Sequence, residues 1–246
     1  MKSKLGSFSR SRLPALGSGA LVLWLSLCVA APLWAQSRYL ASGKPDGVAL
    51  LAPPPAAGSE EEAADLAEAR AVFTQRTPAQ EAKANKDASL AFTLFAPAIG
   101  PSFDLAKLPK TAALMRWVKA DLQGAIDAPK NYWKRRRPYQ MDPSLSIGHP
   151  EPSYGYPSGH SIRGTVYAGV LAELFPEQKE AVLAVGREIG WDRVIIAKHF
   201  PTDVVAGRVL GKAILRELLA SPAFQHDFAE AKAEIAATQT TAAVGK

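Results

Sequence analysis

The feature that most constrains the fold is a four-residue spacing of apolar side chains in two separate segments. The spaced residues are Ile162, Val166, Val170 and Leu174 in residues 159–175, and Ala206, Leu210, Ile214 and Leu218 in residues 202–219. Because about 3.6 residues make one helical turn, this spacing places each set on one face of an α-helix. Alternation of apolar and polar residues, which would indicate strands, is almost absent. The chain is therefore predicted to be all-α.

Other segments carry weaker helical signals. Helices are predicted over residues 60–75, 79–95, 110–127, 177–197 and 222–236 from their helix-forming residues and apolar stripes. Six prolines between residues 128 and 157 instead predict a loop, and a loop of this length is more often functional than idle. We expect a single-domain helical bundle over residues 59–238, an extended Pro-rich lead-in over 36–58 and a flexible tail over 239–246.

The first 35 residues have the pattern of a secretory signal peptide. Four basic residues precede an apolar run from Ala20 to Ala31, which is too short to span a bilayer, and Ala35 offers a cleavage site before Gln36. The alternative is an uncleaved membrane anchor. Cleavage would remove Cys28, the one cysteine of the chain. We therefore expect a periplasmic or secreted protein with no stable membrane insertion after cleavage.

The composition excludes several classes of protein. Hydrophobic residues make up 48% of the chain and charged residues 21%, which is enough apolar content to build a core. Four of the six net positive charges lie in residues 1–35. The remaining charge is small, so no nucleic-acid polymer is predicted as a partner.

Common cofactor motifs are missing from the sequence. There is no HExxH, no paired cysteine and no acid-rich loop with metal-ligand spacing, so no metal and no cofactor are predicted. The glycine-rich nucleotide-binding loops and the GxSxG motif of serine hydrolases are also absent.

Three short stretches carry residues suited to anion chemistry. The first runs from Lys130 to Arg137 and Pro138 and is densely basic; its alternative is a solvated basic surface. The second is the sequence from Pro157 to His160 at a predicted helix start. Unpaired amides there bind anions readily, and Gly159 would permit a close approach, whereas the alternative is a simple helix cap.

The third stretch joins Arg193, His199 and Asp203. Asp203 follows His199 by four residues, so its carboxylate can hold one ring nitrogen and leave the other free to attack. The alternative interpretation is a histidine held by a local acid with no catalytic role.

In this order and at these spacings, the three stretches resemble the signature K-x6-RP, PSGH, SR-x5-H-x3-D. It belongs to the type 2 phosphatidic acid phosphatase superfamily, which includes vanadium haloperoxidases. The chain looks most like the class A bacterial non-specific acid phosphatases, with further similarity in residues 50–55 and 221–225. The resemblance covers residues 48–236 and implies an all-α fold of the acid phosphatase and vanadium haloperoxidase type.

The resemblance also implies a role for each matching residue. His199 would be the nucleophile that forms a phosphohistidine, Asp203 would orient it, and His160 would protonate the leaving alcohol. The remaining matches would hold the phosphate oxygens; they are Lys130, Arg137, Ser158, Gly159 and Arg193. Such a site needs charge neutralisation rather than a metal.

One residue departs from the signature. Asp192 stands where the signature has a serine, and a carboxylate directed inward would repel phosphate. We expect it to face away and to pair with Lys198 or Arg193, and we give it no phosphate-binding role.

The expected function is a metal-independent acid phosphatase that hydrolyses phosphomonoesters of broad range and possesses phosphotransferase activity. Inorganic phosphate or vanadate would inhibit it, and the resemblance implies a homo-oligomer. Its acid preference would come from His160, whose unperturbed pKa lies near ~6.5. The alternatives are an exported phosphate- or polyanion-binding protein with weak or no turnover, a lipid phosphatase and a vanadate-dependent haloperoxidase.

Overall fold

A computed structural model describes residues 37–244; the predicted signal peptide lies outside these residues. The described chain is helical and contains no strand. Its elements are α1 (Gly47–Leu50), α2 (Glu60–Gln75), α3 (Pro78–Asp87), η2 (Phe92–Phe95), α4 (Ala96–Ile99), α5 (Pro109–Trp133), α6 (Pro138–Met141), η3 (Pro143–Leu145), α7 (Gly159–Leu174), η4 (Pro176–Gln178), α8 (Lys179–Ile195), α9 (Pro201–Ala220) and α10 (Pro222–Val244). Within residues 37–244, no helix is both long and apolar enough to cross a membrane.

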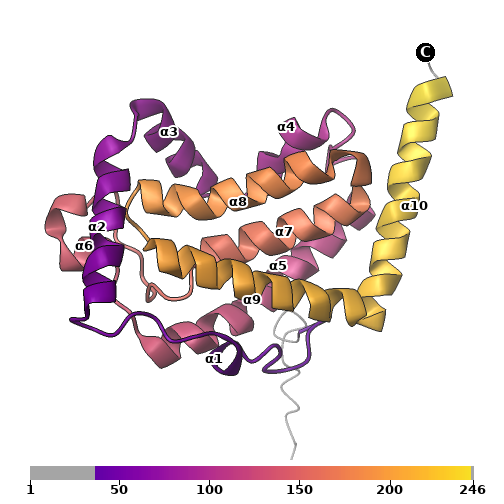
Figure 1. Ribbon diagram of the computed structural model, residues 1–246. Helices are drawn as coiled ribbons and strands as arrows, with labels where there is room; N and C mark the ends of the chain where they lie inside the picture. Colours follow the sequence, from indigo (N-terminus) through magenta and orange to yellow (C-terminus); the bar gives the residue numbers. More distant parts are fainter. Residues whose placement is uncertain (1–36, 245–246) are drawn as a thin grey trace, which may run out of the picture.

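Helix α7 forms the centre of the bundle. It packs against α8 on one side and α9 on the other, and α5 closes the layer behind it (Figure 1). Most of its side chains are buried all round, which is why its four-residue apolar spacing is supplemented by glycines and alanines on the other faces. Helix α10 packs against α5 at the far end of the bundle, away from α6 (Figure 1).

Glycines bring α7 and α8 into backbone contact. A Cβ atom added to Gly164 would lie 2.5 Å from the carbonyl oxygen of Gly186, and one added to Gly186 would lie 2.5 Å from the Cβ of Ala168. No side chain fits between the two helices at this level, so their separation is fixed by the backbones themselves.

Helix boundaries follow local capping chemistry. Ser59 accepts a hydrogen bond from the amide of Glu62 at the start of α2, and Thr77 forms a capping box with Gln80 at the start of α3. Ser158 accepts from the amide of Ser161 at 3.3 Å and begins α7.

Three helix predictions need correction. The predicted helix over 79–95 ends at Asp87, because the chain turns through Leu90 (φ 52°) into η2. Helix α5 does not end at residue 127: it continues through the buried Pro129 to Trp133, since tertiary packing outweighs the one hydrogen bond that a proline removes. The predicted loop over 128–157 is therefore partly helical. Its residues 128–133 belong to α5, and it also contains the short helices α6 and η3.

The last helix is longer than predicted. It runs to Val244 rather than residue 236, and so includes most of the segment predicted as a tail. Of the segment over residues 36–58 that is predicted as an extended lead-in, residues 37–58 contain the single turn of α1 and otherwise no regular element.

Candidate functional site

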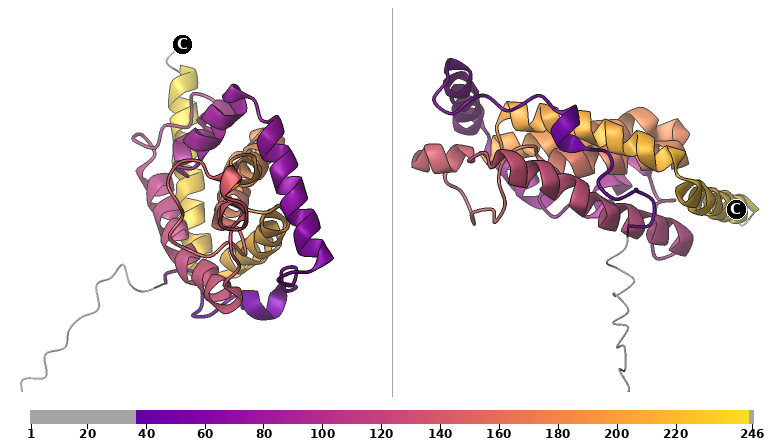
Figure 2. Two further views of the ribbon diagram at one scale, coloured as in Figure 1. Left: turned by 90° about the vertical axis from the view of Figure 1, so that its left-hand side faces the viewer. Right: turned by 90° about the horizontal axis from the view of Figure 1, so that it is seen from below.

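The three signature stretches meet at one end of the bundle. This end carries the C-terminal parts of α5 and α8 and the N-terminal parts of α7 and α9, with α6 beside them (Figure 1). In the view down the bundle, the segment between α6 and α7 crosses this end (Figure 2, left). The antiparallel run of the helices thus gathers residues that are up to 73 positions apart, from Lys130 to Asp203.

His199 lies in the short connection between α8 and α9 and is almost fully buried. Ala197 adopts a left-handed conformation (φ 48°), which turns the chain so that the amides of Lys198 and His199 both donate to the carbonyl of Arg193, at 2.8 and 3.1 Å. This turn fixes the backbone that carries the imidazole.

The imidazole of His199 is held from both sides. Its Nδ1 lies 3.2 Å from Oδ2 of Asp203, and Nη1 of Arg137 donates to its Nε2 at 3.2 Å. A guanidinium only donates, so Nε2 is the acceptor and the ring proton belongs on Nδ1. Burial, together with the charges of Arg137 and Lys130, lowers the pKa of His199 well below its usual value. The ring is therefore neutral, with its Nε2 lone pair directed at a cation.

Asp203 is fully buried at the start of α9 and accepts several hydrogen bonds. Its Oδ2 accepts from the amide of Phe200 at 3.0 Å, and its Oδ1 accepts from Nη1 of Arg135 at 2.6 Å. Asp203 is thereby held as an acceptor facing His199.

Arg135 and Asp65 complete this support, and the sequence did not indicate either. Nη2 of Arg135 donates to Oδ2 of Asp65 at 2.7 Å, and the hydroxyl of Thr202 donates to the same carboxylate. Both side chains are buried, so α2 is tied through two ion pairs to the acid that holds His199.

Three buried cations converge on this place, and we call Lys130, Arg137 and Arg193 the cation cluster. Arg137 touches His199 directly, and Nη1 of the same residue donates to the carbonyl of Lys198 at 2.7 Å. Burial and the neighbouring Arg137 lower the pKa of Lys130 to about 7. Nε of Arg193 is buried and has no hydrogen-bond partner among the described residues. Clustered positive charge with an unsatisfied donor is suited to binding an anion.

The start of α7 borders the cation cluster. A Cβ atom added to Gly159 would lie 3.7 Å from Cε of Lys130, so the first residue of α7 lies beside the cluster. The amide of Ser158 donates to the carbonyl of Asp203 at 2.9 Å, which joins α7 to α9 beside His199. All eight sequence-predicted site residues therefore lie at this one end of the bundle.

The protonation of His160 differs from the expectation. Burial, followed by the charge of Arg193, lowers the pKa of His160 to about 3 rather than leaving it near its usual value. Its Nε2 donates to the carbonyl of Ala88 at 3.2 Å, so Nδ1 is the unprotonated atom of the neutral ring. Without a bound anion, His160 does not carry the proton that an acid needs near neutral pH.

Asp192 faces away from the cation cluster, as expected, but its partner is not the predicted one. It pairs with Lys83 of α3 at 3.0 Å, whereas Lys198 donates to the carbonyls of Ile147 and His149. Burial, with the neighbouring carboxyl group of Asp87, raises the pKa of Asp192 to about 6. Asp192, which stands at the position of the signature serine, thus forms a contact between α8 and α3.

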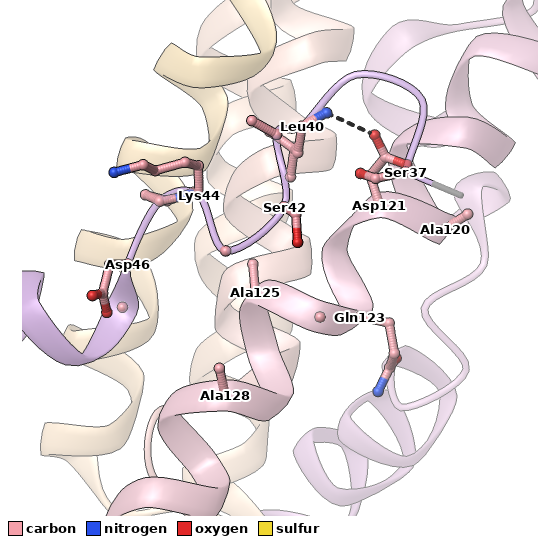
Figure 3. Close-up of a pocket in the computed structure, with 15 residues that line it drawn as sticks. Ser37, Leu40, Ser42, Lys44, Asp46, Ala120, Asp121, Gln123, Ala125 and Ala128 are labelled. Carbon is pink, nitrogen blue, oxygen red and sulfur yellow. Dashed lines mark hydrogen bonds between the residues drawn. The ribbon is translucent and has the colours of Figure 1, made fainter. Parts of the chain in front are cut away.

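Two other features lie away from this end. A groove of about 910 Å³ runs between the segment at 37–47 and α5, where Asp121 accepts from the amide of Leu40 (Figure 3). None of its lining residues belongs to the signature. Among the described residues, His226, Asp227 and Glu230 are close enough to share a metal ion, but they are on α10 and Asp227 already binds Arg38 and Tyr39.

Comparison with known proteins agrees with this geometry. The chain matches the PAP2 superfamily over residues 112–226, a stretch that contains all eight candidate residues. It is 30% identical over 206 residues to an acid phosphatase of Zymomonas mobilis, which covers 80% of this chain and 78% of the relative. It is 31% identical over 203 residues to a non-specific acid phosphatase of Providencia stuartii, which covers 78% and 81%.

The fold is also found in a solved structure. A transmembrane PAP2-type phosphatidylglycerolphosphate phosphatase from Bacillus subtilis superposes with a TM-score of 0.52 at 20% identity, over 71% of this chain and 89% of that one. That structure shows the fold alone; the family match and the two acid phosphatase relatives show that the chain belongs to the PAP2 superfamily. Within it, the chain belongs with the bacterial non-specific acid phosphatases, and this family supports hydrolysis of phosphomonoesters. The predicted all-α fold and the predicted family are confirmed.

Proposed function

We propose that the protein is an exported, metal-independent acid phosphatase that hydrolyses phosphomonoesters of broad range through a phosphohistidine on His199. The observation that carries this proposal is the double hold on His199. Asp203 fixes Nδ1 as the protonated atom, and Arg137, which donates to the unprotonated Nε2, attracts an anion to that side of the ring.

In the first step, Nε2 of His199 attacks phosphorus and the bond from phosphorus to the leaving oxygen breaks. Protonated His160 gives its Nδ1 proton to that oxygen, so a neutral alcohol leaves. The imidazole becomes cationic, and the Asp203 carboxylate stabilises this charge through Nδ1. The cation cluster neutralises the equatorial phosphoryl oxygens throughout.

In the second step, His160 takes a proton from water as the water oxygen attacks phosphorus. The bond from Nε2 to phosphorus breaks, and inorganic phosphate leaves with His160 protonated again. An alcohol in place of water would receive the phosphoryl group, which is the phosphotransferase activity that we also propose.

The low pKa of His160 in the free site changes the source of the acid preference. A phosphomonoester has a second pKa near about 6, so below it the substrate itself brings a proton. Binding of the negative phosphoryl group also offsets the guanidinium charges that lower the pKa of His160. We therefore attribute the acid preference to proton delivery with the substrate.

The test is to trap the intermediate in the mature chain, residues 36–246, with a radiolabelled aryl phosphate and an alkaline quench, since phosphohistidine survives base and not acid. Label should appear in the wild type and in His226→Ala, a control at an exposed histidine on α10, and should be absent from His199→Ala. Unchanged turnover in folded His199→Ala would remove His199 as the nucleophile. A folded wild type that binds phosphate without turnover would favour the binding-protein alternative, and loss of turnover with a chelator would reveal a metal requirement.

A further inference from the structure

The cation cluster is covered by the segment 147–155. Nζ of Lys130 donates to the carbonyls of Tyr154 and Gly155, at 2.5 and 3.3 Å. Arg137 donates to the carbonyl of Ser153 at 2.9 Å and to that of Tyr154 at 3.2 Å. These donors are therefore satisfied by backbone oxygens that carry no charge.

Glu151 provides the negative charge in this segment. Its carboxylate forms an ion pair with Nη2 of Arg193, and its charge opposes the effect of burial by raising the pKa values of Arg193, Arg137 and Lys198. The Glu151 carboxylate thus occupies the position beside the Arg193 guanidinium where an anionic ligand of the cation cluster would also bind.

The backbone of Glu151 is held by Tyr139 of α6. The hydroxyl of Tyr139 accepts a hydrogen bond from the amide of Glu151 at 2.9 Å, and Nζ of Lys198 lies 4.8 Å from the centre of the Tyr139 ring. The side chain of Glu151 is still 26% exposed, whereas that of Arg193 is 3% exposed. Glu151 therefore has a route to solvent, and Arg193 does not.

We propose that Glu151 is an internal competitor of phosphate, which holds Arg193 in the free protein and is displaced when a phosphoryl group binds. This inference rests on the proposed function, because it concerns the same site. The carboxylate and a phosphoryl oxygen are both charged acceptors for one guanidinium fork, so they exclude each other. The binding free energy of phosphate then includes the difference between the Arg193–phosphate and Arg193–Glu151 ion pairs. Because the second pair offsets the first, phosphate binds more weakly and the product is released more readily.

The test compares Glu151→Gln with the wild type by calorimetric titration of inorganic phosphate, and by the KM for an aryl phosphate. A charge-assisted hydrogen bond is replaced by a neutral one, so phosphate should bind about fivefold to tenfold more tightly. The phosphate inhibition constant should fall by the same factor. Glu217→Gln is the matched control, because Glu217 is an exposed residue of α9 that lies about 21 Å along the helix from Asp203. This variant should bind phosphate as tightly as the wild type does.

A second variant tests the tether rather than the charge. Tyr139→Phe removes the acceptor of the Glu151 amide and should tighten phosphate binding by a smaller factor than Glu151→Gln. In the double variant, the tyrosine substitution should add nothing, because there is no carboxylate left to position.

The outcomes separate this proposal from the proposed function. If Glu151→Gln binds phosphate as weakly as the wild type, or more weakly, Glu151 is not a competitor, whatever the turnover. If the wild type shows no turnover but Glu151→Gln binds phosphate more tightly, the competitor stands and the phosphatase proposal fails. Thermal unfolding gives a third readout: phosphate should stabilise Glu151→Gln more than the wild type, and an equal shift would contradict the proposal.

Discussion

Replacement of Gly207 by alanine tests whether the contact between α7 and α9 sets the geometry of the site. A Cβ atom added at this position would lie 2.7 Å from the carbonyl oxygen of Ser158 and 2.7 Å from the Cβ of Ser161. Carbon atoms in contact prefer a separation of about 3.5 Å or more. The first turn of α7 must therefore move by roughly 0.8 Å, or α9 must bend away from it.

The displacement acts directly on the candidate site. The amide of Ser158 donates to the carbonyl of Asp203, and the hydroxyl of Ser161 donates to that of Val204 at 2.7 Å. These bonds hold His160 in register with His199. A misplacement of about 1 Å can cost about 100-fold in rate, and overpacking costs about 1–3 kcal/mol. We expect kcat/KM to fall about 30-fold to 100-fold and the free energy of unfolding to fall by about 1–3 kcal/mol.

The assay is hydrolysis of a chromogenic aryl phosphate at a temperature where urea titration shows the variant to be folded. Gly124→Ala is the matched control, because Gly124 is exposed in the middle of α5 and an added Cβ would meet nothing within 4 Å. It should gain about 0.5–1 kcal/mol of stability and keep its activity. A folded Gly207→Ala variant with the kcat/KM of the control would refute the argument.

Three further predictions concern charge. Burial and Arg193 hold the pKa of His160 at about 3, so binding of sulfate, which carries no titrating proton at pH 5, should draw a proton onto the protein. Calorimetry in two buffers of different ionisation enthalpy should show this proton uptake. The same uptake in His160→Gln would contradict the assignment to His160. The pKa of Asp192 is raised to about 6, so the folded state is destabilised at pH 7, where Asp192 is ionised. Asp192→Asn should therefore unfold at a higher urea concentration than the wild type at pH 7, and this gain in stability should disappear towards pH 4. A gain in stability that is independent of pH would contradict this cause. Asp65→Asn breaks a buried pair with Arg135 and should cost about 3 kcal/mol of stability, and it should lower kcat more than it changes KM; an unchanged kcat in the folded variant would separate Asp65 from the positioning of His199.

The regular part of the fold could be predicted because the buried faces are continuous. Helices α7 and α9 keep an apolar residue at every fourth position, and their predicted bounds differ from the structure by about one residue. Pro129 misled the prediction for α5, since a proline inside a helix is tolerated only when neighbouring elements compensate, and the sequence does not show them.

The resemblance to the signature joined the three distant stretches, but local patterns alone could predict only those contacts of the candidate site that are close in sequence. His199 and Asp203 are four positions apart, whereas Asp65 meets Arg135 across 70 positions and no local pattern joins them. Arg135 was hidden in a run of basic residues. Arg135 and Arg137 are buried, whereas Lys134 and Arg136 are exposed, so a period of two would have separated the two faces of the run.

The direct contact between Gly164 and Gly186 bears on how new substrate ranges could arise on this scaffold. Helix α7, which carries His160, and helix α8, which ends four residues before His199, are set backbone against backbone, so almost any substitution there moves the catalytic frame. The segment 147–155, by contrast, is joined to that frame largely through side chains of the cation cluster that bind its carbonyl oxygens, and such bonds accept many different sequences. Directed evolution of the leaving-group preference should therefore collect its useful mutations in this one segment and leave the glycine contact unchanged.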